Sequence, residues 1–187
     1  MLRYMLQISI LLVAGLAGCS TLASDLWGSH YGIGKGSKVI LHVPLTIDAR
    51  DHQAFIQGGE VKKEKTAAYN SSYNEYYPFC YFEIRSPSNQ PETISPGEFE
   101  ITRVTADETE IVQSKPVRVA SLFHFDLAGT PSQIVETVIM ELRSDAQPNV
   151  EQLVCADGFA DPGQVVMPTL KQIRDTLGSV ATLELVH

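Results

Sequence analysis

The amino-acid sequence predicts a mainly β fold, an antiparallel β sandwich or partly open barrel with one C-terminal amphipathic helix. From residue 38 onward, apolar residues mostly alternate with polar ones, which is the period of a half-buried strand. Turn signals rich in Gly, Pro, Asp and Ser recur between these short segments. Only residues 168–177 change to the helical period. Short strands with frequent turns favour a sandwich or barrel architecture.

The strands can be assigned in order from this alternation. The expected strands are 38–47, 53–57, 60–65, 77–85, 98–104, 117–127, 134–143, 150–155 and 180–186. Gly58-Gly59 predicts a hairpin turn between the second and the third of them. Pro96-Gly97 predicts the turn before the fifth, and we expect the acidic stretch 106–110 to be a solvated loop.

The expected helix has one apolar stripe and a signal at each end. Leu170, Ile173 and Leu177 fall on one side of it, and charged residues fall on the other. Pro168 suits the first turn and Gly178 suits the C-terminal cap. We therefore expect a single helix packed on a sheet.

Length and charge restrict the function. The chain has 187 residues, enough for one domain with a sizeable core, which we place at residues 38–187. The formal net charge is −8, and no basic cluster is larger than Lys62-Lys63-Glu64-Lys65. Nucleic-acid binding is therefore not expected, because phosphates require a positive surface.

The N-terminus carries an export and anchoring pattern. An apolar run over residues 4–18 follows Arg3 and is shorter than the ~20 residues of a spanning helix. It ends in Leu16-Ala17-Gly18-Cys19, which resembles the lipobox of bacterial lipoproteins. The alternatives are an ordinary secretory signal or a short membrane-associated helix, with Cys19 incidental.

The lipoprotein resemblance implies a cellular location. It implies that residues 1–18 are a signal peptide and that Cys19 becomes the acylated first residue, carrying diacylglyceryl and usually a third acyl chain such as palmitate. Ser20 stands where an Asp would retain such a protein at the inner membrane. The resemblance therefore implies an outer-membrane anchor with the domain on the periplasmic face. The Gly- and Ser-rich residues 19–37 are expected to form a flexible tether.

Two cysteines remain after the anchor. Cys80 shares a strand face with Phe82 and Ile84, and Cys155 shares one with Leu153, so both thiols are expected to point inward. In an oxidising periplasm two such thiols predict one disulfide. The alternative is a redox or nucleophilic thiol, although neither lies in a Cys-x-x-Cys motif.

Chemical motifs are few, and we expect no catalytic residue, metal or cofactor. There is no Gly-x-Ser-x-Gly elbow and no His-Glu-x-x-His helix. His124 and Asp126 would share one strand face as a metal or acid–base pair, but the simpler interpretation is an amphipathic strand with its polar side in water. Asp48, Asp51 and His52 form a weaker candidate, since a site needs convergent geometry.

Aromatic residues form the richest local pattern. Tyr69, Tyr73, Tyr76 and Tyr77 are set among Asn, Ser and Glu, and Phe79, Tyr81 and Phe82 follow them. Tyrosines in such a setting are typical of recognition surfaces, because the ring offers contact area and the hydroxyl stays hydrated. We expect the four tyrosines to bind an envelope protein or a glycan. The alternative is that they pack over the edge of the sheet.

Three classes of function remain open. The first is a non-catalytic binding or accessory domain for an envelope component, held at the outer membrane. The second is a carrier or chaperone for a lipid or other apolar ligand, which a partly open barrel could enclose. The third is a hydrolytic or metal-dependent enzyme built on His124 with Asp126, or on His52 with its acidic neighbours. We expect the first.

Overall fold

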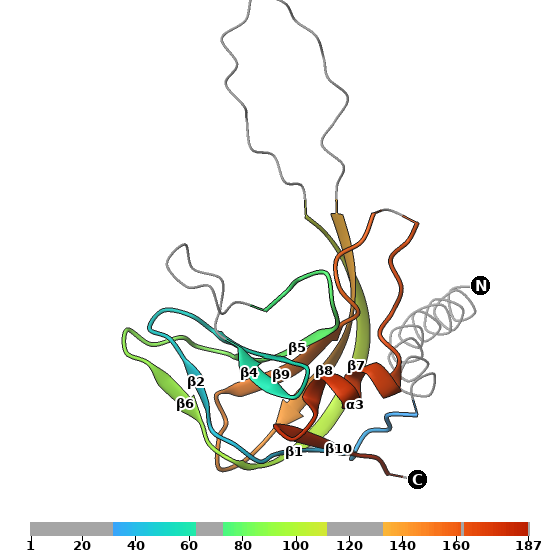
Figure 1. Cartoon of the computed structure of the whole chain (residues 1–187). Coiled ribbons are helices and arrows are strands. Elements are labelled where there is room, and N and C mark those ends of the chain that lie inside the picture. Colours follow the sequence, from blue (N-terminus) through green and yellow to red (C-terminus); the bar gives the residue numbers. More distant parts are fainter. Residues whose placement is uncertain (1–31, 63–72, 112–132, 162, 187) are drawn as a thin grey trace, which may run out of the picture.

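The computed structural model describes residues 32–62, 73–111, 133–161 and 163–186. These residues form a mainly β structure that contains one helix (Figure 1). The strands are β1 (Lys38–Leu41), β2 (Leu45–Ile47), β3 (Gln53–Gln57), β4 (Glu60–Lys62), β5 (Phe79–Ile84), β6 (Glu92–Ile94), β7 (Gly97–Ile111), β8 (Gln133–Arg143), β9 (Val150–Ala156) and β10 (Ala181–Glu184). The helix is α3 (Leu170–Leu177).

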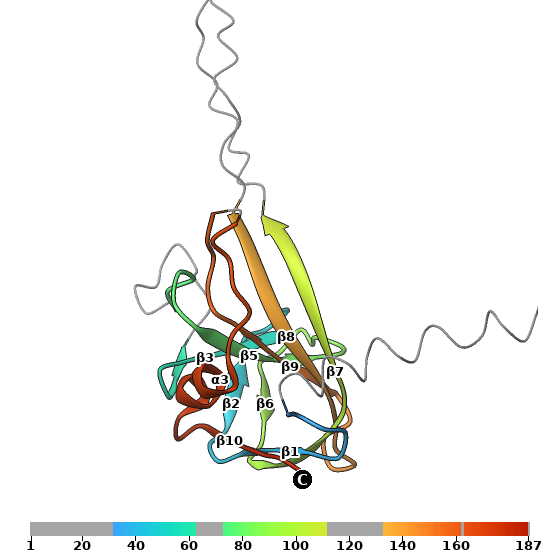
Figure 2. The ribbon, with the colours of Figure 1, turned by 90° about the vertical axis from the view of Figure 1, so that its right-hand side faces the viewer.

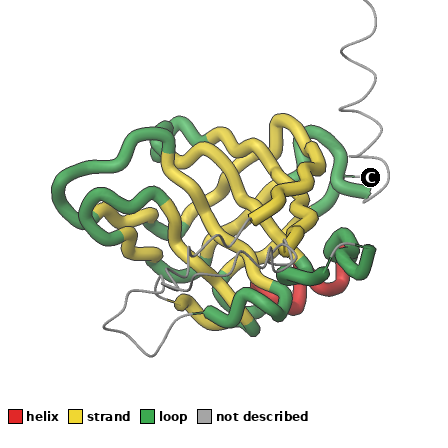
Figure 3. Tube along the Cα trace, turned by 90° about the horizontal axis from the view of Figure 1, so that it is seen from above, coloured by secondary structure: helices red, strands yellow, loops and turns green. Residues whose placement is uncertain are grey.

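Eight of the strands form one antiparallel sheet in the order β10-β1-β7-β8-β9-β5-β3-β4. The sheet curls into a half-barrel, as the view from above shows (Figure 3). The other two strands, β2 and β6, pair with each other as a separate ribbon. The expected antiparallel β fold with one C-terminal helix is confirmed, and of the two expected architectures the partly open barrel describes it.

The main core lies on one face of the half-barrel, which we call the inner face. Alternate residues of every sheet strand except β4 point into it, as the two-residue period requires. The β2–β6 ribbon adds Leu45, Ile47 and Ile94, and the helix adds Ile173 and Leu177, all of them buried. The inner face is thus covered by the ribbon and the helix together.

The expected strand 38–47 is in fact two strands in different sheets. β1 ends at Leu41 and β2 begins at Leu45, with Pro44 between them. Proline has no N–H for a ladder bond and restricts the residue before it, so the chain bends here and passes from the half-barrel to the ribbon. The alternation of Val39, Leu41 and Leu45 continues across the break because both strands face one core.

The acidic stretch 106–110 is not a loop, as expected, but the far part of β7. This strand pairs with β8 in register from Arg103↔Glu141 to Ile111↔Gln133. The two strands rise together beyond the rest of the sheet (Figure 2). Backbone pairing within a long hairpin outweighs the weak strand preference of Asp and Glu, since β propensity depends strongly on context. Strand β6 was also not expected.

The domain begins before residue 38, where the sequence analysis placed the end of the tether. Ile33 is 0% exposed within the main core, and Ser37 is buried. The backbone N–H of Gly36 donates to the carbonyl of Ile101 at 2.9 Å, and Ser37 accepts from the N–H of Val186 at 3.2 Å. Residues 33–37 therefore belong to the packed domain, because burial of Ile33 and these hydrogen bonds hold them there.

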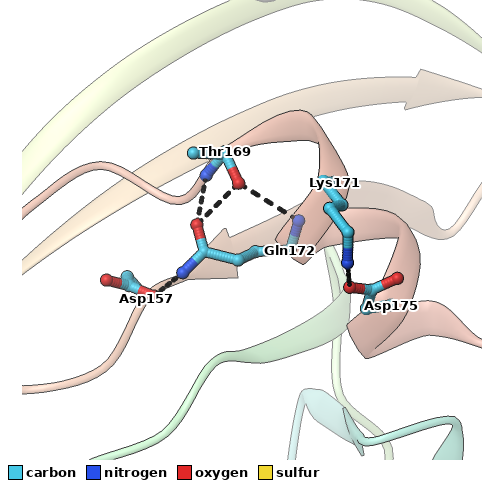
Figure 4. Close-up of polar contacts among 5 residues, drawn as sticks. All are labelled: Asp157, Thr169, Lys171, Gln172 and Asp175. Carbon is cyan, nitrogen blue, oxygen red and sulfur yellow. Dashed lines mark hydrogen bonds and ion pairs between the residues drawn. The ribbon is translucent and has the colours of Figure 1, made fainter.

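Helix α3 begins two positions later than expected. Thr169 is the N-cap, and it forms a capping box with Gln172, so Pro168 lies just before the helix and not in its first turn (Figure 4). Gly178 closes the helix as expected, with its N–H donating to the carbonyl of Arg174 at 2.9 Å. The amide of Gln172 also donates to the side chain of Asp157 (Figure 4).

The helix also links the two edges of the half-barrel. It packs against β10 at one edge and against β3 near the other. The N–H of Gly59, in the β3–β4 turn, donates to the carbonyl of Thr176 at 2.9 Å. Gly58 and Gly59 both have positive φ, as the expected hairpin turn requires. The open side of the half-barrel is therefore bridged by α3.

Several expectations fall outside the described residues. These are the signal peptide with Cys19, the strand 117–127 with the turn after it, Tyr69, and the pair His124 and Asp126. Across the part of the chain that the structure describes, no helix combines the length and apolar character needed to cross a membrane.

Candidate functional site

The outer face of the half-barrel, opposite the main core, can be read from the strand register. Residues on neighbouring strands form three rows across the sheet. The central row is Phe55, Tyr81, Val154, Ile139 and Thr105. The polar row is Gln53, Glu83, Gln152, Glu141 and Arg103, and the third row is Phe79, Ala156, Thr137 and Asp107. Apart from Thr105, the central row is apolar or aromatic where an outer face is normally polar.

The residues of the polar row form hydrogen bonds and one ion pair with one another. The amides of Gln53 and Gln152 both donate to Glu83, at 3.4 and 3.2 Å. Arg103 pairs with Glu141 at 3.1 Å. Exposed ion pairs continue beyond this row with Arg143–Glu100, Lys38–Glu98 and Arg85–Glu151. This half of the outer face is an ordinary solvated surface, in which each pair stabilises the fold only slightly.

The other half carries a cluster of five aromatic rings. Phe55 and Tyr73 stack with their centroids 4.2 Å apart and their planes at 9°. Phe79 lies 4.9 Å from Tyr73 and 6.3 Å from Phe159, and Phe55 lies 5.3 Å from Tyr81. Phe55 and Phe79 are buried, whereas Tyr73, Tyr81 and Phe159 are half-buried. The cluster is therefore a second, smaller core that reaches the surface.

Two loops deliver Tyr73 and Phe159 to this cluster. The side chain of Gln57 holds the first loop: its amide donates to the carbonyl of Asn74 at 2.8 Å and its carbonyl accepts from the N–H of Asn74 at 2.8 Å. The N–H of Phe159 donates to the carbonyl of Glu75 at 2.8 Å. The two loops are thus bonded to each other and to β3, which fixes both rings over the sheet.

Gly158 allows the two loops to approach closely. Its φ is +122°, and a Cβ at this position would lie 2.8 Å from the carbonyl carbon of Tyr76. Only glycine combines this backbone conformation with that contact. The close approach places Phe159 beside Phe79.

Between the loops and the polar row lies a hollow of ≈ 360 Å³, which we call the aromatic groove. Tyr81, Val154 and Ile139 line its central part, and Tyr73 and Phe159 line one side. Its polar lining residues are Gln53, Gln152, Thr137 and Asp107. A hollow of this size, lined by both apolar and polar groups, has the features of a small binding site.

The electrostatic environment of the aromatic groove is unfavourable to added negative charge. Burial, together with the nearby Glu83, Tyr73 and Asp107, raises the pKa of Tyr81 to about 12. The Tyr81 hydroxyl therefore stays protonated even at pH values where an ordinary tyrosine ionises, and it can donate a hydrogen bond.

The aromatic residues singled out in the sequence divide among different environments. Tyr73, Phe79 and Tyr81 meet at the aromatic groove. Tyr76 and Tyr77 lie in the same loop but are exposed, and Tyr77 borders a separate hollow beside the helix. Phe82 is fully buried in the main core, where its ring centroid lies 5.9 Å from that of Phe99. The recognition role of the tyrosines stays a prediction.

The sequence analysis missed two members of the cluster. Phe55 points away from its neighbours Ala54 and Ile56, which face the main core, so the two-residue period already marked it as an outer-face aromatic. Phe159 comes from an irregular loop that follows β9. No periodic signal could have placed it, because its position depends on the contact of Gly158 with Tyr76.

The predicted pairing of the two remaining cysteines is confirmed. Cys80 and Cys155 lie directly opposite each other on β5 and β9 and are disulfide-bonded. Both are buried in the main core with Phe82, Ile84 and Leu153, as their strand parity predicted. The bond lies beneath the aromatic groove, on the opposite face of the same strands.

Asp48, Asp51 and His52 are not brought into a site. Asp48 and His52 are exposed at the turn before β3, and the carbonyl of Asp48 accepts from the N–H of Asp51 at 3.1 Å. Within the described residues, no three His, Cys, Asp or Glu side chains are grouped so that they could hold a metal ion.

Comparison with family models, with curated proteins and with solved structures finds no match to this chain.

Proposed function

We propose that this chain is a non-catalytic binding domain, anchored by acylated Cys19 to the bacterial outer membrane on its periplasmic face, and that it binds an envelope component through the aromatic groove. The single observation that carries the proposal is the groove itself. The residues of the central row that line it are apolar or aromatic, whereas the rest of this face of the sheet carries ion pairs. Apolar surface of this kind, rimmed by polar groups, is typical of interaction sites.

Two further features support the proposed location. The lipobox resemblance of Leu16-Ala17-Gly18-Cys19 supplies the anchor. The Cys80–Cys155 disulfide fits an oxidising compartment, since cytosolic proteins seldom keep such bonds.

The shape of the half-barrel favours this function over a lipid carrier. A carrier would hold its ligand on the inner face. There, Phe82, Phe99 and Met140 are each 0% exposed and are packed by the ribbon and the helix. The outer face offers the accessible hollow, so binding is proposed there.

The test is chemical cross-linking of the full-length protein in intact bacterial envelopes, followed by mass spectrometry of what is captured. Ile139→Arg puts a bulky charged side chain in the groove and should remove the captured component. Val166→Arg is the matched control, because Val166 is 56% exposed and does not line the groove. A Cys19→Ala form reports the contribution of the anchor.

Thermal unfolding of each variant checks that it is folded. Val166→Arg should capture the same component as the unchanged protein, whereas Cys19→Ala should lose it through mislocalisation. If folded Ile139→Arg still captures that component at an undiminished level, the groove is not the binding site and the proposal is wrong.

A further inference from the structure

The proposed function leaves the chemistry of the bound group open, and the lining of the aromatic groove restricts it. None of the described residues that line the groove is a lysine, arginine or histidine. Asp107 contributes a carboxylate, and the neighbouring polar row adds Glu83, whereas Arg103 in that row is paired with Glu141. The formal net charge of the chain, −8, has the same sign. A negatively charged ligand would therefore be repelled, and a positively charged one attracted.

The rings add a second attraction for positive charge. The face of an aromatic ring is the negative pole of its quadrupole, so a cation within ~6 Å of the ring centre is stabilised. Tyr73, Tyr81 and Phe159 bring partly exposed rings to one hollow. The cation–ring attraction is larger where water is partly excluded, and Tyr81 is half-buried where it lines the groove.

The size and the apolar lining of the groove fit a side chain with an aliphatic stem. A volume of ≈ 360 Å³ accommodates one long side chain but not a secondary-structure element. Tyr81, Val154 and Ile139 form an apolar strip that leads across three adjacent strands. The methylene stems of lysine and arginine bury well on such surfaces while the charged end reaches a polar group. Asp107 lies on β7, at the next strand beyond Ile139.

We propose that the aromatic groove binds a lysine or arginine side chain of a partner polypeptide, with its stem along Tyr81, Val154 and Ile139 and its charged group near Asp107. The inference rests on the proposed function and specifies its ligand. A neutral glycan is the competing ligand, because rings, amides and a carboxylate also suit sugars. Charge complementarity favours the cation, because Asp107 lines the groove and no described lysine, arginine or histidine does.

The test is a titration of the full-length protein in detergent micelles, followed by NMR of the methyl groups of Ile139 and Val154. The probes are the blocked tripeptides Ala-Lys-Ala and Ala-Arg-Ala. Ala-norleucine-Ala is the uncharged control with the same stem, and a tetramer of N-acetylglucosamine represents glycans. We expect both basic peptides to shift the groove methyls and to bind about fivefold or more tighter than the norleucine peptide. Their affinity should fall as salt increases.

A pair of matched variants isolates the carboxylate. Asp107→Asn should weaken binding of the lysine peptide by about threefold. Asp145→Asn makes the same chemical change at an exposed position outside the groove and should leave the affinity unchanged. Both positions are exposed, so neither variant should fail to fold.

The outcomes separate this inference from the proposed function. Equal binding of the norleucine and lysine peptides overturns the inference, and so does binding of the glycan alone or no shift with any probe. In each case the proposed function survives if Ile139→Arg loses its captured component in envelopes. If the lysine peptide binds as expected but Ile139→Arg keeps that component, the groove chemistry is supported and the proposed function is wrong.

Discussion

At the scale of single residues, Tyr81 is the side chain whose chemistry depends most on the fold. The raised pKa means that the folded state holds this proton more tightly than the unfolded chain does. The unfolded chain releases it near 10.0 and the folded chain near 12. The stability linked to this group is therefore fully present below pH 10 and is lost as the pH rises towards 12.

We predict that Tyr81→Phe removes this alkaline loss. Between pH 10 and 12 the unchanged protein should lose up to ~3 kcal/mol of unfolding free energy relative to Tyr81→Phe, beyond any difference at neutral pH. The measurement is urea unfolding at a series of alkaline pH values. Tyrosinate absorbance of the two proteins gives the pKa directly, as a difference step near 12. A step at the ordinary tyrosine value would contradict the assigned environment.

The pKa of Asp157 is also raised in the folded state, so this group too reduces stability as the pH increases, but at acid pH. Burial raises the pKa of this carboxyl above its ordinary value. The charged form is therefore disfavoured in the folded state, and the group reduces stability as the pH rises through its folded pKa. We predict that Asp157→Asn is more stable than the unchanged protein at neutral pH. The difference should disappear below the ordinary pKa of aspartate, where both side chains are neutral; thermal midpoints across that range test this.

The sequence predicted single residues well where strand parity decides their direction. The inward placement of Cys80, Phe82 and Cys155 follows from a period of two. Strand parity cannot predict the direction of a side chain that lies in a loop. For that reason Phe159 was missed, and Tyr73 could not be distinguished from the exposed Tyr76, although both were singled out.

At the scale of elements, the contact between Gly178 and Gly59 joins the helix to the hairpin at the edge of the sheet. Gly178 has φ +50°, and a Cβ there would lie 2.4 Å from the Cα of Gly59. We predict that Gly178→Ala costs about 2–4 kcal/mol of unfolding free energy, from backbone strain and from forcing the helix off the β3–β4 turn. Urea unfolding measures the loss.

Gly163→Ala is the matched control for this prediction. Gly163 also has a positive φ, +84°, but a Cβ added there would meet nothing within 4 Å, so only backbone strain of about 1 kcal/mol is expected. Equal losses in the two variants would mean that the approach of the two glycines contributes nothing to the link between helix and hairpin.

The elements themselves were predictable to different degrees. β3, β5, β8, β9 and α3 were expected within a few residues of their observed bounds. The acidic half of β7 was not, because its strand is imposed by pairing with β8 rather than by local preference. The break between β1 and β2 was also missed, although Pro44 signalled it.

At the scale of the whole molecule, one pair of strands carries both the disulfide and the aromatic groove. β5 and β9 are neighbours near the middle of the eight-stranded sheet. The disulfide lies on the inner face of these strands and the aromatic rings lie on the outer face. Register alone yields the three rows of the outer face, but the hollow exists only where the two loops meet the sheet. Because the sequence alone does not give the strand register, it could predict the aromatic character of this region but not the groove.

The disulfide makes stability depend on the redox state of the compartment. It joins cysteines 75 positions apart, and closing so long a loop restricts the unfolded chain by about 4–5 kcal/mol in the chain-entropy description. We predict that Cys80→Ala combined with Cys155→Ala lowers the unfolding free energy by about this amount. Reductant should destabilise the unchanged protein and leave the double variant unaffected.

This prediction also bears on the proposed location. The measurement is alkylation of free thiols after cells are denatured in the presence of the alkylating reagent. Cys80 and Cys155 should be protected by their disulfide if the domain is in the periplasm, and should be alkylated if it is in the cytosol. Deleting residues 1–18 supplies the cytosolic control, since the same domain should then remain reduced. If the two cysteines of the full-length chain were reduced as well, the periplasmic location would be wrong even with the fold and the groove intact.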